Sequence, residues 1–200
     1  MTCSPPLAEQ SPEQLRAGVY TLLAHLLAGA PDAALLARLR AIAATGAPND
    51  ALAMAWVGLK QAAEQAQAEA LAAEYHNLFI GLGRGELVPY GSWYQTGFLM
   101  EQPLGELRRE LAALGYERGD NTCEPEDHAA ALCELMALLI MDKVVPLETQ
   151  QRFFITHVGS WLEAFFKDLE AAQGARFYRA VGRLGYTFMQ LEQYYLTMLV

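Results

Sequence analysis

Apolar side chains recur at helical spacing along almost the whole chain, and this pattern is the strongest constraint on the fold. The segment Ser11-Pro12-Glu13-Gln14 is typical of a helix start, with a serine cap, a proline in the first turn and a glutamine able to reach back. Apolar residues then follow at positions 15, 19, 22, 23, 26 and 27. No run shows the sustained alternation of a half-buried strand. The sequence therefore predicts an all-α fold.

Glycines, prolines and capping residues divide the chain into roughly six to eight helices. The expected helices cover residues 11–29, 32–44, a long segment from Asn49 or Asp50 towards Phe79, 103–114, 125–142, 147–172 and 175–199. Gly115 and Gly174 stand where glycines that end helices are expected. A chain of 200 residues is long enough for one domain with its own core. We therefore expect a single globular helical domain over residues 1–200.

The segment 81–91 interrupts the helical pattern with glycines at 81, 83 and 85 and a proline at 89. These glycines do not form a GxGxxG pattern, and neither a preceding strand nor a following Lys-Ser/Thr pair supports a phosphate-binding loop. We expect the segment to be a hinge between N-terminal and C-terminal helical halves. Such a hinge favours a mainly monomeric protein that also forms a minor domain-swapped dimer.

The net charge of −9 disfavours nucleic acid and anionic membranes as partners and suits a basic partner. A helical DNA-binding regulator is disfavoured further because no basic recognition helix is evident. The three cysteines lack CxxC spacing, which fits a reducing compartment. The N-terminus does not resemble a secretory signal, and the most apolar run, residues 129–141, is too short to span a bilayer. These features indicate a soluble cytoplasmic protein.

The acidic segment Glu124-Pro125-Glu126-Asp127-His128 has two interpretations. It could be a structural helix start, with Pro125 in the first turn and the carboxylates complementing the helix dipole. Alternatively, these carboxylates, together with the nearby Glu117 and Asp120, could bind a guanidinium group through paired hydrogen bonds. His128 beside Asp127 could be a hydrogen-bonding partner or a proton-transfer group.

The segment Pro89-Tyr90-Gly91-Ser92-Trp93-Tyr94 is expected to be a turn that carries three aromatic side chains. These rings could fill the core beneath the turn. They could instead line a groove for an apolar peptide, where aromatic residues are favoured.

An enzymatic alternative uses Asp127 and His128 as an acid/base pair in a helical pocket. A third catalytic group and an oxyanion donor are not evident, and Ser92 lacks an evident base. The four histidines lie on different expected helices without metal-ligand spacing, so we expect no metal or cofactor. The aromatic positions 153, 154, 157, 161 and 165 share one helix face, which is typical of a core.

Four segments, taken in order, resemble the TorD/DmsD family of cytoplasmic chaperones for molybdenum-containing oxidoreductases. They are Glu74-Tyr-His-Asn-Leu-Phe-Ile-Gly81, Pro89-Tyr-Gly-Ser-Trp-Tyr94, Glu124-Pro-Glu-Asp-His128, and the helix carrying His157, Trp161 and Phe165. The resemblance covers residues 74–165 and is most specific at the third segment. Residues 129–131 are all alanine, where bulkier apolar residues are common in the family.

The resemblance implies an all-helical chaperone rather than an enzyme. Its partner would be the twin-arginine signal peptide, the apoenzyme, or both, of a molybdopterin oxidoreductase, which it would hold until cofactor insertion is complete and export can proceed. The client itself cannot be identified from the sequence. The family's binding positions correspond here to Tyr90, Ser92, Trp93, Tyr94, Glu124, Pro125, Glu126, Asp127 and His128.

Overall fold

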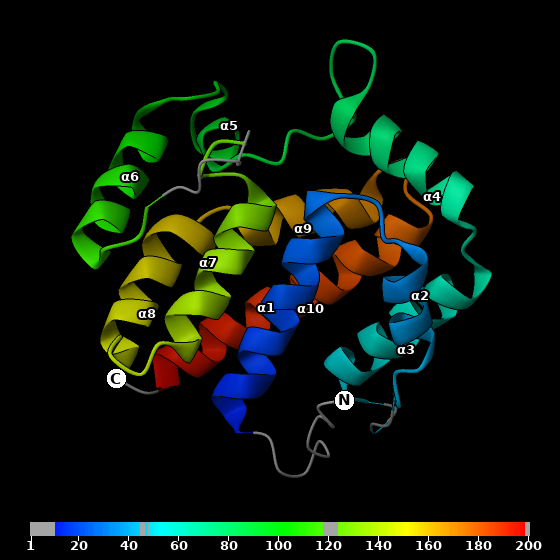
Figure 1. Ribbon diagram of the computed structural model, residues 1–200, viewed down its shortest axis with the longest axis horizontal. Helices are drawn as coiled ribbons and strands as arrows, with labels where there is room; N and C mark the ends of the chain where they lie inside the picture. Colours follow the sequence, from blue (N-terminus) through cyan, green and yellow to red (C-terminus); the bar gives the residue numbers. More distant parts are fainter. Residues whose placement is uncertain (1–10, 45–46, 48, 118–123, 199–200) are drawn as a thin grey trace.

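The computed structural model describes residues 11–44, 47, 49–117 and 124–198. Within these ranges the chain forms ten α-helices and two π-helical turns, and it contains no β-strand (Figure 1). The predicted all-α fold is confirmed. The helix count exceeds the expected six to eight because two of the predicted long helices are interrupted and because residues 91–96, within and beyond the predicted turn at 89–94, form a short helix.

The first half of the chain supplies four α-helices and one π-helical turn. They are α1 (Pro12–Ala28), α2 (Ala33–Arg40), α3 (Ala51–Gln65), α4 (Ala68–Tyr75) and η2 (His76–Ile80). Side-chain caps define their starts, because Ser11 and Gln14 form a reciprocal capping box and Asp32 caps α2. Asp50, one of the two predicted candidates, caps α3.

The second half of the chain supplies the remaining elements. They are α5 (Gly91–Thr96), α6 (Gln102–Leu114), α7 (Ala129–Met141), α8 (Leu147–Phe153), η3 (Phe154–Val158), α9 (Leu162–Ala171) and α10 (Phe177–Met198). Gly115 ends α6 in a left-handed conformation, as predicted. Gly174 follows α9 at a distance of three residues and does not cap it, because the C-cap is Ala172.

The helices pack around one hydrophobic core to which residues from α1 to α10 contribute. Helix α1 packs against α7, and α10 packs against α9 and α3 while also contacting α1 and α4. In Figure 1, α5 and α6 lie at one side of the molecule and α2, α3 and α4 at the other. Side chains from the face predicted to be core, including Phe153, Phe154, Trp161 and Phe165, are all buried.

The prediction of one continuous helix from residue 50 towards Phe79 is wrong. The backbone is extended at Ala66 and Gln67, which separates α3 from α4. Arg40 of α2 donates hydrogen bonds to the carbonyls of Ala63 (2.9 Å) and Ala66 (3.1 Å). A side chain distant in sequence therefore satisfies the carbonyls at the end of α3, and local helix propensity could not reveal this break.

The prediction of one helix over residues 147–172 is also wrong. The chain passes from α8 into the π-helical turn η3 and then through a turn at residues 159–161 before α9 begins. The turn buries the Trp161 ring, whose Nε1 donates to the carbonyl of His157 (2.9 Å). Gly159 is required there, because a Cβ atom would lie 2.7 Å from the Phe154 ring. The tight packing of two large aromatic residues thus replaces a regular helix.

Candidate peptide-binding site

The aromatic segment (residues 89–94) and the acidic segment (residues 124–128) are distant in the sequence but directly paired in the structure. Gly91 N donates to the carbonyl of Asp127 (2.9 Å), and Ala129 N donates to the carbonyl of Pro89 (2.8 Å). Tyr90 and His128 form an isolated antiparallel bridge between these two bonds. The backbone therefore fixes the side chains of both segments relative to one another.

Asp127 is the most buried carboxylate of this pair of segments, with 3% of its surface exposed. Its Oδ2 accepts a hydrogen bond from Ser92 N (2.8 Å) in the first turn of α5. Its Oδ1 is buried as well, and no group among the described residues donates to it. Buried polar atoms nearly always have a partner, so an unpartnered carboxylate oxygen is an exception that calls for an explanation.

His128 is the N-cap of α7, because its Nδ1 accepts a hydrogen bond from Ala130 N (3.1 Å). The ring is buried and meets the Tyr90 ring edge-on, with 5.0 Å between the ring centroids. Burial lowers the pKa of His128 more than the neighbouring carboxylates of Glu124 and Asp127 raise it. A neutral ring with Nδ1 as acceptor places the proton on Nε2.

The predicted start of this helix at Pro125 is wrong, because α7 begins at Ala129. Residues 125–128 form a turn instead, in which His128 N donates to the carbonyl of Pro125 (3.1 Å). Asp127 therefore precedes the helix and reaches across to α5 rather than lying in the first turn of its own helix. Among the described residues no hydrogen bond joins the Asp127 and His128 side chains, so the pair lacks the direct contact of a catalytic dyad.

The other acidic residues have separate roles. Glu124 accepts a hydrogen bond from the Tyr90 hydroxyl, and burial together with this bond raises the pKa of Tyr90. Glu126 accepts two hydrogen bonds from Arg108 of α6, at 3.0 and 2.8 Å. Glu117 is exposed, and Asp120 lies outside the described residues.

A pocket of about 210 Å³ opens between the two segments. Its lining residues are Tyr90, Ser92, Leu99, Met100, Glu124, Pro125 and Asp127. Five of these seven were predicted as site residues. Leu99 and Met100 were missed, although the consecutive apolar residues Phe98, Leu99 and Met100 after Gly97 were a visible signal.

Trp93 and Tyr94 have other neighbours. The Arg84 guanidinium lies over the Trp93 ring, 4.7 Å from its centroid. The Tyr94 hydroxyl donates to Asp168 (3.0 Å), and its ring lies 5.5 Å from that of Trp161. Of the two interpretations of the aromatic segment, Tyr90 therefore matches the groove and Tyr94 matches the core.

Trp161 supports the site from behind. A Cβ atom at Gly91 would lie 2.9 Å from Trp161 Nε1, so the indole packs directly against the backbone of the aromatic segment. Only glycine permits this approach. The turn that carries Trp161 thus supports the backbone of Tyr90 and Ser92 without lining the pocket.

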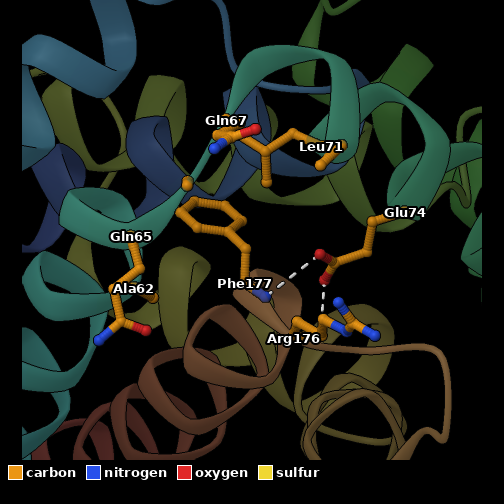
Figure 2. Close-up of a pocket in the computed structure, with 9 residues that line it drawn as sticks. Ala62, Gln65, Gln67, Leu71, Glu74, Arg176 and Phe177 are labelled. Carbon is orange, nitrogen blue, oxygen red and sulfur yellow. Dashed lines mark hydrogen bonds between the residues drawn. The ribbon is translucent and has the colours of Figure 1, made fainter.

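A second pocket, of about 420 Å³, lies where the α3–α4 break faces the start of α10 (Figure 2). Glu74 accepts hydrogen bonds here from the backbone N–H groups of Arg176 (2.8 Å), Phe177 (3.3 Å) and Tyr178 (2.8 Å). Its carboxylate therefore caps α10. The sequence did not indicate this role, because the acceptor and the donors are about a hundred residues apart.

The segment 81–91 is tied to η2 rather than free of contacts. Glu86 N and Leu87 N donate to the carbonyls of Asn77 (3.2 Å) and Leu78 (2.8 Å). Gly85 is packed closely, since a Cβ atom would lie 2.5 Å from the Leu78 carbonyl oxygen. The expected hinge motion and the domain-swapped dimer stay predictions.

The described residues contain no group of three His, Cys, Asp or Glu side chains that could hold a metal ion. No described helix combines the length and the apolar character that are needed to cross a membrane.

Comparisons with known proteins agree with the resemblance seen in the sequence. The family model of the nitrate reductase delta subunit matches residues 46–167. The chaperone protein TorD of Vibrio cholerae is 31% identical over 147 residues, which cover 68% of this chain and 66%, just under two thirds, of that protein. The TorD of Shewanella loihica is 29% identical over 94% of this chain and 96% of its own length.

Among solved structures, a protein from Archaeoglobus fulgidus, described as a candidate redox enzyme maturation protein, has the same fold. The TM-score is 0.61 at 19% identity, with 94% of this chain and 99% of that protein covered. The family model spans more than half of the chain, including both segments that form the 210 Å³ pocket. The chain therefore belongs to the TorD chaperone family, which the nitrate reductase delta subunit model describes.

Proposed function

We propose that this protein is a cytoplasmic chaperone that binds the twin-arginine signal peptide, the apoenzyme, or both, of a molybdopterin oxidoreductase. By holding the client, it would allow cofactor insertion to finish before export. Membership of the TorD family supports the general role, since the relatives are named chaperones. The proposal assigns no catalytic step to the chain, and it requires no cofactor or metal.

The observation that most supports this proposal is Asp127, which lines the 210 Å³ pocket and whose buried Oδ1 has no donor among the described residues. An unpaired buried acceptor costs about 1–3 kcal/mol, so a donor from a bound partner would remove this cost. A guanidinium group suits the position because it donates several hydrogen bonds in a fixed plane and keeps its charge.

The surroundings of Asp127 match a ligand that is basic at one end and apolar beyond it. Glu124 brings a second carboxylate to the pocket, while Leu99 and Met100 bring apolar surface. The net charge of −9 favours rapid encounter with a basic segment. A twin-arginine signal has this order of chemistry, with a basic region followed by an apolar region.

Calorimetry with synthetic peptides tests the proposal. The probe peptide has two adjacent arginines followed by an apolar alanine/leucine segment, and its matched control has lysines in place of the arginines. We expect the arginine peptide to bind without added metal or nucleotide and the lysine peptide to bind more weakly, because an ammonium group cannot make paired, coplanar hydrogen bonds. If neither this peptide nor the signals of co-encoded molybdoenzymes bind, signal recognition by this chain is refuted.

A further inference from the structure

Phe98, Leu99 and Met100 form a consecutive apolar run between α5 and α6 that lies largely in solvent. Their exposed fractions are 68%, 49% and 74%. Isolated exposed apolar residues are common, but a run of three adjacent ones costs solubility and points to an interaction surface. We call residues 98–100 the apolar lip of the pocket.

The lip is held in a defined conformation. Thr96 Oγ1 accepts from Phe98 N (3.2 Å) and donates to the carbonyl of Ser92 (2.8 Å), while Met100 N donates to Ser92 Oγ (3.1 Å). Met100 has a φ of 59°, a left-handed conformation that non-glycine residues rarely adopt. Several hydrogen bonds thus maintain an unfavourable backbone that keeps apolar side chains in water, which is a feature associated with functional sites.

Helix α6, which follows the lip, is also anchored on two sides. Arg108 binds Glu126 beside the pocket, and Glu110 accepts from His157 Nε2 (2.8 Å) across the interface with η3. The lip is therefore connected at both ends to fixed elements. A surface that is ordered before binding loses less conformational entropy when a partner docks.

The lip and Asp127 belong to the same pocket. Leu99 and Met100 line it together with Asp127, and Ser92 contacts both, since its N–H donates to Asp127 and its Oγ accepts from Met100. A ligand group that occupies this pocket beside Asp127 therefore also lies close to the lip. The neighbouring residues of a bound peptide would then lie on or near these apolar side chains.

We propose that the apolar lip, Phe98 to Met100, is the docking surface for the apolar segment of the client peptide whose arginine pairs with Asp127. This inference rests on the function proposed above and adds residues that were not among the predicted site residues. Charge complementarity favours such a partner over a second copy of the chain or an anionic membrane, because the net charge of −9 repels both.

The test compares the binding of two peptides to the wild type, two lip variants and one control variant by calorimetry. One peptide carries the two arginines and the apolar segment, and the other carries the arginines followed by a glycine/serine segment. We expect Leu99→Ser and Met100→Gly each to weaken binding of the apolar peptide roughly tenfold, equal to about 1.4 kcal/mol, because each removes apolar surface that is buried on docking. Binding of the glycine/serine peptide should stay at the wild-type level.

Met100→Gly protects the test against simple misfolding. Glycine adopts a positive φ without strain, so this variant should be at least as stable as the wild type while lacking the side chain. Val144→Ser is the matched control, because Val144 is an apolar turn residue with 86% exposure beyond the C-terminal end of α7, away from the lip. It should leave both affinities unchanged.

The outcomes separate this inference from the function on which it rests. If the wild type binds neither peptide, signal recognition by this chain fails, and the inference about the lip fails with it. If the wild type binds the apolar peptide and the lip variants bind it equally well, the lip is not its docking surface. A lip variant that changes only the oligomeric state seen by light scattering, or only adsorption to anionic vesicles, would also overturn the proposal by assigning the lip to a second copy or a membrane.

Discussion

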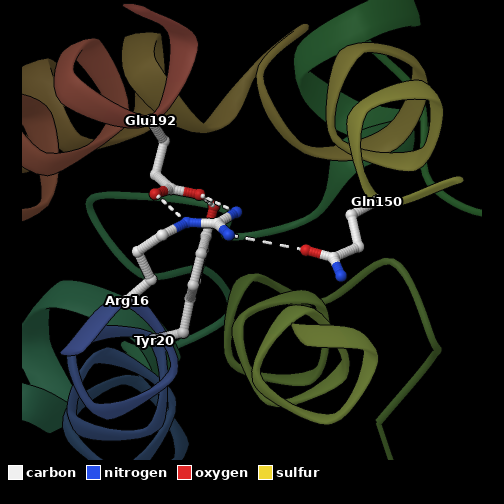
Figure 3. Close-up of polar contacts among 4 residues, drawn as sticks. All are labelled: Arg16, Tyr20, Gln150 and Glu192. Atoms are coloured by element: carbon white, nitrogen blue, oxygen red, sulfur yellow. Dashed lines mark hydrogen bonds and ion pairs between the residues drawn. The ribbon is translucent and has the colours of Figure 1, made fainter. Parts of the chain in front are cut away.

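Two regions of this protein bury charged side chains, and they differ in whether the hydrogen-bonding groups are satisfied. In the first, Arg16 and Glu192, exposed by 7% and 1%, form two hydrogen bonds of 2.7 and 3.0 Å (Figure 3). Tyr20 donates to the same carboxylate (3.3 Å), and Gln150 Oε1 accepts from the guanidinium (3.5 Å). In the second, Asp127 is 3% exposed, and the described residues donate to only one of its two oxygens.

This difference distinguishes a structural charge from a charge that is available to a ligand. Burial alone would lower the pKa of Arg16, but the hydrogen bond and charge of Glu192 raise it above the ordinary value. The pair is thus complete within the chain and joins α1 to α10. Asp127 joins two segments through Oδ2 and lines the pocket, while its buried Oδ1 has no donor among the described residues. In the folded protein the charges of Arg16 and Glu192 compensate each other, whereas the charge of Asp127 is compensated only in part.

The largest expected effect is a loss of stability when one partner of the buried Arg16–Glu192 pair is removed. Arg16→Met leaves Glu192 buried without its cation, which should lower the free energy of unfolding by about 3–5 kcal/mol. Urea denaturation followed by circular dichroism measures this change. Peptide affinity of the fraction that remains folded should not change, because the pair belongs to α1 and α10 rather than to the pocket.

Arg152→Met is the matched control for this prediction. The Arg152 side chain is 61% exposed and contacts Glu110 at 3.4 Å, so its loss should have little effect on stability. The double variant Arg16→Met/Glu192→Leu should recover much of the lost stability, because it removes both buried charges. Equal losses in the two arginine variants would contradict the structural role of the buried pair.

The next largest effect concerns Asp127→Asn, which tests the open carboxylate. The amide oxygen can still accept from Ser92 N, so stability should change little. Affinity for the arginine peptide should fall roughly ten- to hundredfold, because hydrogen bonds to charged groups contribute about 1.5–3 kcal/mol. Calorimetry for affinity and urea denaturation for stability should therefore give separate responses.

Asp168→Asn removes the same charge from an exposed carboxylate that binds Tyr94. It controls for the general loss of negative charge and should reduce affinity far less than Asp127→Asn. If the two variants bind the arginine peptide equally, the acidity of the whole protein attracts the peptide and the Asp127 pocket does not recognise it.

Local signals in the sequence predicted much of this architecture, and contacts between distant residues account for what they missed. Ser11, Pro12 and Gln14 formed the expected capping box because capping depends on a few adjacent residues. The break after α3 depends on Arg40, more than twenty residues away, and no local pattern indicates it. The start of α7 was misplaced for the same reason, since Asp127 and Pro89 hold residues 125–128 outside the helix.

The candidate site shows the same division. The residue types near positions 90 and 127 indicated a mixture of carboxylates and aromatic rings, and the family resemblance selected them. Neither could show that Asp127 has one satisfied and one unsatisfied oxygen, because Ser92 N reaches only Oδ2 in the folded protein. Leu99 and Met100 line the pocket beside Ser92, whose Oγ accepts a hydrogen bond from Met100 N. This contact too exists only in the folded protein.

A smaller effect on stability is expected at Glu74, which extends the comparison between satisfied and unsatisfied carboxylates. Glu74 is partly exposed, and both of its carboxylate oxygens accept hydrogen bonds. It accepts three backbone N–H groups at the start of α10. Glu74→Gln should lower the free energy of unfolding by about 1 kcal/mol, because a charge that caps a helix start is lost while one amide oxygen stays an acceptor. Binding of the arginine peptide should be unaffected. A loss of affinity without a loss of stability would instead assign the 420 Å³ pocket beside Glu74 to ligand binding.

The smallest expected effect is a dependence of stability on pH that comes from His128, the buried neighbour of Asp127. Burial lowers its pKa from the ordinary value of 6.5, so the unfolded chain takes up this proton at a higher pH than the folded protein does. As the pH falls below 6.5, the unfolded state binds more protons, and the free energy of unfolding falls until the folded ring also becomes protonated.

His128→Asn keeps a side chain that caps helices well but does not titrate, so its stability should decline less on acidification than that of the wild type. Urea denaturation of both proteins between about pH 8 and pH 5 isolates His128, because the other histidines are common to the two. Parallel curves would show that the imidazole is not held neutral in the folded state.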